Sequence, residues 1–262
     1  MSNSNEEIEG QEISLPVRSF CGGGKQLKKE TLPIVNQPLK IGHRGAKGHI
    51  AENTLESIQK AMDFGVDGIE IDVHLCQTGE LVVYHDFTLE RLTDGTGEIA
   101  MKSLDELKSL KINGQFEIPT LLEVLDLIDK KCILNIELKG NGTAFETCKS
   151  IQLYTETKGW KFDDFIVSSF NYDALKSVYS INMNIPLAVL TESDLDSAAD
   201  FARTIKATAI HPHYMLLDHN NVKQFQKSGY KVNTWTVNTV ESIALMKTFG
   251  VDGIISDYPD KL

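Results

Sequence analysis

Two kinds of apolar pattern alternate from Pro38 to the end of this 262-residue chain. Short apolar runs bounded by turn residues predict buried strands, and longer runs with helical spacing predict the helices between them. The predicted strands cover residues 39–42, 68–73, 133–138, 165–169, 187–190, 207–211, 231–235 and 253–256. Eight such β/α units predict a closed barrel whose catalytic face lies at the carboxyl ends of the strands. A doubly wound open sheet is the alternative, because one wrongly assigned strand would change the count.

A further apolar run at residues 81–85 follows the second strand after a turn near residues 78–80. A parallel crossover needs a dozen or more residues, so this run is predicted to return as the second arm of an antiparallel hairpin. Counting back from the turn places His85 roughly beside Asp72 and Val73. The hairpin would therefore bring a histidine to the carboxyl end of the second strand.

Residues 87–118 interrupt the alternation with turn-forming residues and one short predicted helix. They are predicted to be a short insertion between strand two and helix two. Residues 1–36 are polar, include three consecutive glycines and show little periodicity, which predicts a flexible N-terminal leader. Residues 37–262 are then expected to form a single barrel domain that includes the insertion.

Acidic side chains gather at two neighbouring strand ends. Residues i and i+2 of a strand point to the same side, so Glu70 and Asp72 share one face, and Glu137 and Lys139 repeat the pattern on the next strand. Three carboxylates this close repel one another and raise each other's pKa unless a cation sits among them. Ligation by oxygen atoms alone favours Mg²⁺ or Ca²⁺ over zinc. The pattern therefore predicts one divalent cation at this end of the barrel.

The sequence His43-Arg44-Gly45 follows the first strand directly and so lies on the same rim. The planar guanidinium of Arg44 matches two phosphate oxygens. A lone histidine is more often structural than catalytic, but His43 and His85 each end a strand beside the acidic cluster. One of them could act as base and the other as acid near neutral pH. The helix that follows is predicted to begin at Asn53, whose side chain would cap its first turn.

The net charge of −11 argues against nucleic acid as a partner, because its phosphates need a basic face. A small anionic substrate is still compatible with this charge, since the cation, Arg44 and Lys139 would supply local positive charge. The chain contains no apolar run near the ~20 residues of a membrane span and no secretory signal. Its four cysteines form no CxxC pair, which suits a reducing compartment. We therefore expect a cytoplasmic protein without an integral membrane segment.

Taken together, these motifs resemble the glycerophosphodiester phosphodiesterase family. The matching blocks are HRG at 43–45, ENT at 52–54, EIDV at 70–73, TGELVVYHD at 78–86, IELK at 136–139 and GIISDYP at 253–259. The resemblance implies a TIM-type (β/α)8 barrel that hydrolyses glycerophosphodiesters to glycerol 3-phosphate and an alcohol with a divalent metal. By position, it implies an acid/base pair of His43 and His85, metal ligands Glu70, Asp72 and Glu137, and phosphate contacts Arg44 and Lys139. Trp235 resembles the family's aromatic wall near the substrate, with core packing as an equal alternative.

Two other functions are compatible with the sequence. One is cleavage of lysophospholipids in the manner of a phospholipase D, and the other is a catalytically silent barrel that binds phosphodiesters. The preferred alcohol group, the choice between Mg²⁺ and Ca²⁺, and the oligomeric state are left open. So is the attacking group, which is either water or the substrate's own glycerol hydroxyl through a cyclic phosphate.

Overall fold

Nine strands form one sheet in the computed structural model, which describes residues 37–262. The eight parallel strands are β1 (Leu39–His43), β2 (Gly68–Leu75), β4 (Ile133–Leu138), β5 (Phe165–Ser169), β6 (Leu187–Thr191), β7 (Ala209–Pro212), β8 (Lys231–Thr234) and β9 (Gly253–Ser256). β1 pairs with both β2 and β9, so the parallel strands close on themselves. The predicted (β/α)8 barrel is confirmed, and the open-sheet alternative is wrong. The predicted leader at 1–36 lies outside the described residues.

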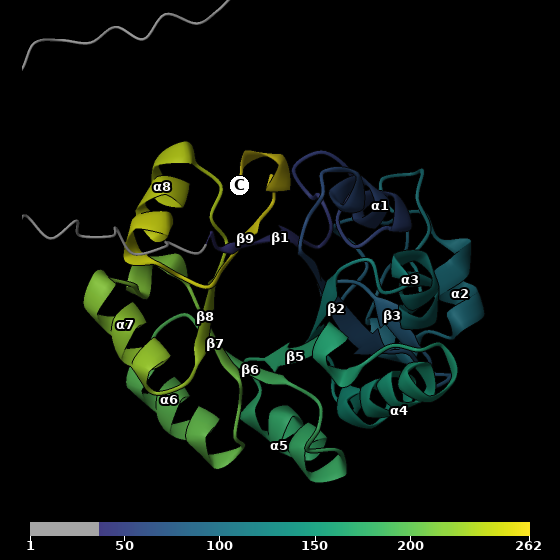
Figure 1. The fold of residues 1–262 in the computed structure, drawn as a ribbon. Helices are drawn as coiled ribbons and strands as arrows, with labels where there is room; N and C mark the ends of the chain where they lie inside the picture. The colour runs from purple at the N-terminus through teal and green to yellow at the C-terminus, as the bar shows by residue number, and fades with distance from the viewer. Residues whose placement is uncertain (1–36) are drawn as a thin grey trace, which may run out of the picture. The chain divides into compact units, whose positions relative to one another are not determined.

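A ring of helices surrounds the strands (Figure 1). They are α1 (Leu55–Asp63), α3 (Leu121–Ile128), α4 (Thr143–Thr157), α5 (Tyr172–Ile181), α6 (Leu195–Thr204), α7 (His219–Lys227) and α8 (Val240–Phe249). A single 3₁₀ turn, η4 (Pro259–Lys261), follows β9. Within residues 37–262, every helix is too short or too polar to cross a membrane.

The alternation of side chains along each strand divides the molecule into two environments. On β2, Ile69, Ile71 and Val73 are fully buried against the surrounding helices as part of the main hydrophobic core. Glu70 and Asp72 alternate with them and therefore face the barrel interior. Burial of apolar side chains between the strands and the helices stabilises the barrel, at roughly 25 cal/mol per Å² of apolar surface. The same packing fixes the register that holds the acidic side chains inside.

The predicted hairpin is present. β3 (Leu81–Val83) runs antiparallel to β2, and Val73 pairs with Val83. The backbone N–H of Tyr84 donates to the carbonyl of Asp72 at 3.0 Å, so Tyr84, not His85, lies opposite Asp72. The expected register is thus off by one residue, because the turn closes between Cys76 and Glu80, where the Cys76 N–H donates to the Glu80 carbonyl.

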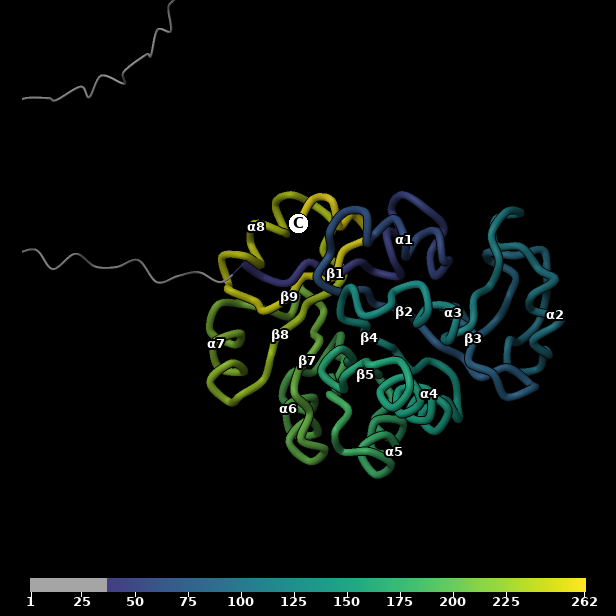
Figure 2. Tube along the Cα trace, turned by 45° about the vertical axis from the view of Figure 1, so that its right-hand side comes forward, coloured from purple at the N-terminus to yellow at the C-terminus, as the bar shows by residue number. Residues whose placement is uncertain are grey.

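The insertion at 87–118 packs against the return arm of the hairpin. It contains the 3₁₀ turn η1 (Ile99–Met101) and helix α2 (Leu104–Ser109), which begins at a capping box formed by Ser103 and Glu106. A second hydrophobic core joins it to the hairpin, with buried residues Cys76, Val82, Tyr84, Leu89, Ile99, Leu107, Ile112 and Ile118. Figure 2 shows this segment beside β3 and α3, outside the ring of parallel strands.

Candidate active site

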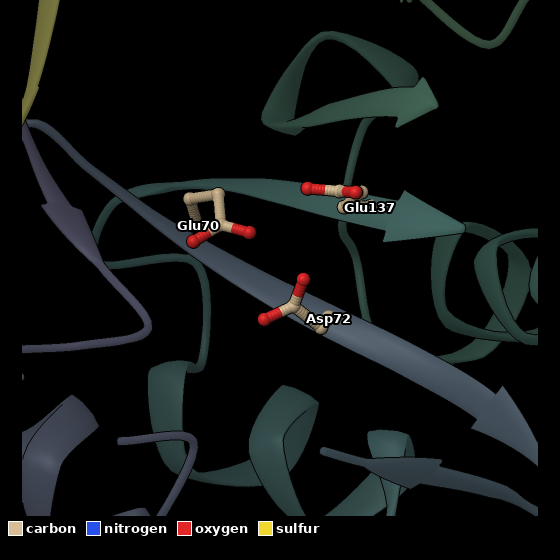
Figure 3. Close-up of side chains that lie close together, drawn as sticks. All are labelled: Glu70, Asp72 and Glu137. Atoms are coloured by element: carbon tan, nitrogen blue, oxygen red, sulfur yellow. The ribbon is translucent and has the colours of Figure 1, made fainter. Parts of the chain in front are cut away.

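Three carboxylates meet at the carboxyl ends of β2 and β4. Glu70, Asp72 and Glu137 each offer an oxygen, and these oxygens all lie within 4.8 Å of one another. Figure 3 shows the three side chains turned toward one another above the two strands. The strand register explains the meeting, because Asp72 and Glu137 are directly paired neighbours and Glu70 lies two residues before Asp72. The structure therefore brings together the predicted acidic cluster, hereafter the carboxylate triad.

The electrostatics of the triad suit a bound cation. Burial, followed by the charges of its two neighbours, raises the pKa of Glu70 well above its usual range. Burial and the charge of Asp72 raise the pKa of Glu137. Three buried oxygens, one from each carboxylate, have no hydrogen-bond partner among residues 37–262, namely Glu70 Oε1, Asp72 Oδ1 and Glu137 Oε1. An all-oxygen donor set with unpaired buried atoms fits a hard divalent ion.

Two basic side chains lie beside the triad. The Nε of Arg44 is 3.2 Å from Asp72 Oδ2, and the backbone N–H of Arg44 donates to Glu70 Oε2 at 3.0 Å. The Nζ of Lys139 is 3.1 Å from Glu137 Oε1 and 3.9 Å from Asp72 Oδ1. Two cations against three carboxylates leave one excess negative charge in the triad itself. The predicted phosphate contacts are therefore at the site, and the charge balance still favours an added cation.

His43, at the end of β1, is held by a carboxylate that is distant in sequence and lies near the C-terminus of the chain. Its Nδ1 lies 2.6 Å from Asp257 Oδ1, and its Nε2 is 3.9 Å from Glu70 Oε2. Asp257 is itself fixed by Asn238, whose Nδ2 donates to Oδ2 at 2.9 Å. Burial lowers the pKa of His43, although the hydrogen bond to Asp257 opposes this effect. The ring is thus oriented with Nε2 toward the triad.

His85 has a matching arrangement just beyond β3. Its Nδ1 lies 2.6 Å from Asp86 Oδ1, and its Nε2 is 3.3 Å from Lys139 Nζ. A lysine that donates to Nε2 and a carboxylate that accepts from Nδ1–H are the partners of a neutral imidazole protonated at Nδ1. Burial is the largest cause that lowers the pKa of His85. The backbone carbonyl of His85 also interacts with His74 Nε2 at 3.1 Å, which gives His74 a structural position behind the site.

A pocket opens over these groups at the carboxyl ends of the strands. Most of the predicted site residues line it, namely His43, Arg44, Glu70, His85, Glu137, Lys139 and Trp235, and Asp72 lies buried beneath. Trp235 follows β8, and its Nε1 donates to the His211 carbonyl at 2.8 Å. Phe170 lines the same pocket with its ring edge-on to Trp235, 5.5 Å between centroids. Trp235 is therefore both anchored to the barrel and part of the pocket wall.

Several residues around the pocket were missed by the sequence analysis. Asn53 was expected to cap α1, but the cap is Thr54, which accepts from the Ser57 N–H. Asn53 instead adopts a left-handed backbone, φ 58°, and donates from Nδ2 to Asp72 Oδ2 at 2.9 Å. Asparagine is a preferred cap and also tolerates this backbone, so local pattern could not separate the two roles. Asp86 and Asp257 lie within the motifs TGELVVYHD and GIISDYP that resemble the family, and these motifs were the sequence signal that could have identified both residues.

Glu52 links the site to the insertion. Its buried carboxylate accepts from Arg44 Nη1 at 2.7 Å and from Arg91 Nη2 at 2.6 Å. Burial alone would raise the pKa of Glu52, but the hydrogen bonds from Arg91 and the charges of Arg44 and Lys47 outweigh it and lower the pKa to about 2.

A Glu52→Gln variant is expected to flatten the acid dependence of stability. An unfolded glutamate titrates near pH ~4.3, so a lowered folded-state pKa gives stability that is present above this value and lost as the pH falls toward 2. The free energy of unfolding of the wild type should fall by about 2 to 3 kcal/mol more than that of the variant between pH ~5 and ~2. Denaturant titrations at several pH values measure this, with exposed Glu56→Gln as control. Parallel curves for wild type and Glu52→Gln would contradict the expectation.

Comparisons with known proteins identify the family of this chain. The model of the glycerophosphoryl diester phosphodiesterase family matches residues 43–261. A glycerophosphodiester phosphodiesterase of Caldanaerobacter subterraneus is 36% identical over 233 residues, covering 86% of this chain and 96% of the relative. One from Bacillus altitudinis is 32% identical and covers 84% of this chain and 95% of the relative.

Solved structures of similar fold support the same family assignment. An Oleispira antarctica phosphodiesterase in complex with the product sn-glycerol-3-phosphate superposes with a TM-score of 0.78 at 33% identity, covering 86% of this chain and 94% of that one. A structure described as that of a "putative glycerophosphodiester phosphodiesterase" from Galdieria sulphuraria has a TM-score of 0.77 at 28% identity, and the match covers 86% of this chain and 96% of that one. The chain therefore belongs to the glycerophosphoryl diester phosphodiesterase family.

Proposed function

We propose that this protein hydrolyses glycerophosphodiesters to glycerol 3-phosphate and an alcohol, with His43 and His85 as acid and base. The observation that carries the proposal is the pair of histidine–carboxylate contacts. Nδ1 of His43 lies 2.6 Å from Asp257, and Nδ1 of His85 lies 2.6 Å from Asp86. Both rings line the pocket that contains Glu70 and Glu137. Two oriented imidazoles in one pocket that Arg44 and Lys139 also line suit general acid–base catalysis.

In this proposal Glu70, Asp72 and Glu137 hold one divalent cation, Mg²⁺ or Ca²⁺. When bound, such an ion supplies positive charge that polarises the phosphoryl group and neutralises charge developing on its oxygens. Arg44 and Lys139 bind the non-bridging phosphate oxygens from the protein side. Their existing contacts with Asp72 and Glu137 keep both side chains extended toward the triad.

The reaction needs two proton transfers. One histidine accepts the proton of the attacking hydroxyl through Nε2 as the new P–O bond forms. The other donates a proton to the leaving alcohol oxygen as the old P–O bond breaks. The attacking hydroxyl belongs either to water or to the substrate's glycerol, in which case water opens the cyclic phosphate in a second step. Asp257 and Asp86 hold the rings in place and stabilise the imidazolium that forms.

Trp235 and Phe170 contribute an aromatic wall to the same pocket. We propose that this wall contacts the carbon skeleton of the substrate, because the aromatic faces offer apolar contact close to the phosphate-binding groups. The partner is thus a small glycerophosphodiester and not a nucleic acid, whose phosphates an acidic protein would repel. A cytoplasmic location remains part of the proposal.

A substrate panel tests this function. Purified protein is assayed with Mg²⁺ or Ca²⁺ against glycerophosphocholine, glycerophosphoethanolamine and the matching lysophospholipids, and glycerol 3-phosphate or lysophosphatidic acid is measured. We expect turnover of the deacylated substrates. Faster turnover of the acylated substrates would instead support the lysophospholipase D alternative. Saturable binding of glycerophosphocholine without turnover under either metal would support the silent binding barrel.

A further inference from the structure

Arg91, in the insertion, is the one side chain described in residues 37–262 that contacts both Asp86 and Glu52. Its Nε donates to Asp86 Oδ2, and its Nη2 donates to Asp86 Oδ1 at 3.0 Å. The same guanidinium reaches Glu52 Oε1 at 2.6 Å and Oε2 at 3.4 Å. The planar fork of an arginine is suited to such two-sided binding, whereas an ammonium group is not.

Each carboxylate that Arg91 holds is the partner of a group in the active site. Asp86 accepts from Nδ1 of His85, and Glu52 accepts from Arg44. A continuous series of contacts therefore runs from Arg44 through Glu52, Arg91 and Asp86 to His85, made of ion pairs as far as Asp86 and a hydrogen bond to His85. It joins the phosphate-binding side of the site to one of its two proton-transfer groups without passing through the carboxylate triad.

The backbone around Arg91 is fixed on both sides. Leu89, two residues earlier, is fully buried in the second hydrophobic core, and its N–H donates to the Gly97 carbonyl at 3.1 Å. The hydroxyl of Thr93, two residues later, donates to the Leu89 carbonyl at 2.8 Å. The carbonyl of Leu92 accepts from the Asn113 N–H at 2.7 Å. The insertion thus presents Arg91 on a loop that is already folded.

We propose that Arg91 is a positioning residue through which the insertion sets the orientation of His85. By holding both oxygens of Asp86, Arg91 fixes the carboxylate that accepts from Nδ1 of His85, so that Nε2 points to the pocket side, where it lies 3.3 Å from Lys139 Nζ. The proposal rests on the proposed function, because it assigns a catalytic consequence to His85. It also gives the insertion a role in catalysis beyond covering the hairpin.

If Arg91 had a purely structural role, its loss would lower the stability of the protein and leave the turnover number of the folded protein unchanged. The Arg91 side chain is 46% exposed, but the carboxylate of Glu52 that it contacts is only 4% exposed. Arg91→Gln should therefore stay folded with a somewhat lower free energy of unfolding, which denaturant titration measures. Its effect should appear in the turnover number, and only weakly in KM, because Arg44 keeps its own contact with Glu52.

The kinetic test is a double-mutant cycle. Arg91→Gln and Asp86→Asn are each expected to lower kcat by about 10-fold or more, but by less than the roughly 10²- to 10⁴-fold expected for loss of the acid or base itself. Because both act through His85, the double variant should lose little more than the worse single variant. Arg91→Lys should recover only part of the loss. The matched control is Arg203→Gln, which removes an exposed arginine paired with Asp200 at 3.1 Å and should leave kcat unchanged. Additive losses in the cycle would overturn the proposal.

A second readout does not depend on turnover. The ¹⁵N chemical shifts of the His85 ring, assigned with a His85→Asn variant, report which nitrogen carries the proton. The wild type should show the Nδ1–H form, and Arg91→Gln should shift His85 toward the Nε2–H form. An unchanged ring signal in Arg91→Gln would overturn the proposal even if activity fell. If the wild type turned over no phosphodiester while Arg91→Gln still shifted the His85 ring signal, the proposed function would be refuted and the positioning role of Arg91 would stand.

Discussion

His43→Ala and His85→Ala are each expected to lower kcat for glycerophosphodiester hydrolysis by about 10²- to 10⁴-fold, because each removes one proton-transfer group. Both rings line the pocket, and each is oriented through Nδ1 by its own carboxylate. Steady-state assays with glycerophosphocholine measure the loss. Neither histidine belongs to the carboxylate triad, so Mg²⁺ or Ca²⁺ binding, followed by calorimetry, should change far less than the rate.

The matched control for these variants is His219→Ala. His219 is exposed at the start of α7 and lies outside the pocket. A histidine variant that keeps near-normal kcat would show that the reaction does not need that ring. A variant that loses metal binding and activity together would mean that the histidine acts on the metal site instead.

Glu137→Gln is expected to weaken binding of the divalent cation by more than the 10- to 100-fold that loss of an outer partner typically costs, and to abolish most activity. The amide keeps the shape of the side chain but removes one of the three negative charges. Chelation of the wild type should have the same effect on activity. Calorimetric titration with Ca²⁺ and Mg²⁺ measures the affinity, and Glu146→Gln, at an exposed ion pair on α4, is the control.

The same variant should be more stable than the wild type when no metal is present. The raised folded-state pKa of Glu137 means that its stability contribution is present below the unfolded value, near pH ~4.3, and is lost as the pH rises through the folded value. Glu137→Gln removes that loss. Denaturant unfolding in chelator above neutral pH should show a higher free energy of unfolding for the variant. Equal metal affinity, or a less stable metal-free variant, would contradict a cation site at the triad.

The barrel and its carboxylate triad could be predicted from sequence because both follow from local periodicity. Once Ile69, Ile71 and Val73 are assigned to the outer face of a strand, Glu70 and Asp72 must lie inside. The neighbouring strand then supplies Glu137 at the same level. The structure agrees with each of these steps.

Contacts between distant segments could not be predicted in this way. Asp257 reaches His43 across 214 positions of the chain, and nothing in either segment alone specifies the pair. The hairpin register was off by one residue because it depends on which residues close the turn. Arg91 lies in a loop without periodicity, so only the folded insertion reveals its contacts with Asp86 and Glu52.

The ³¹P NMR time course of glycerophosphocholine with the purified protein tests the central claim most directly. The account predicts that the diester signal is replaced by that of glycerol 3-phosphate when Mg²⁺ or Ca²⁺ is present, and that chelator or His85→Ala stops the conversion. Persistence of the diester signal with either metal, or its replacement by phosphocholine, would contradict the account.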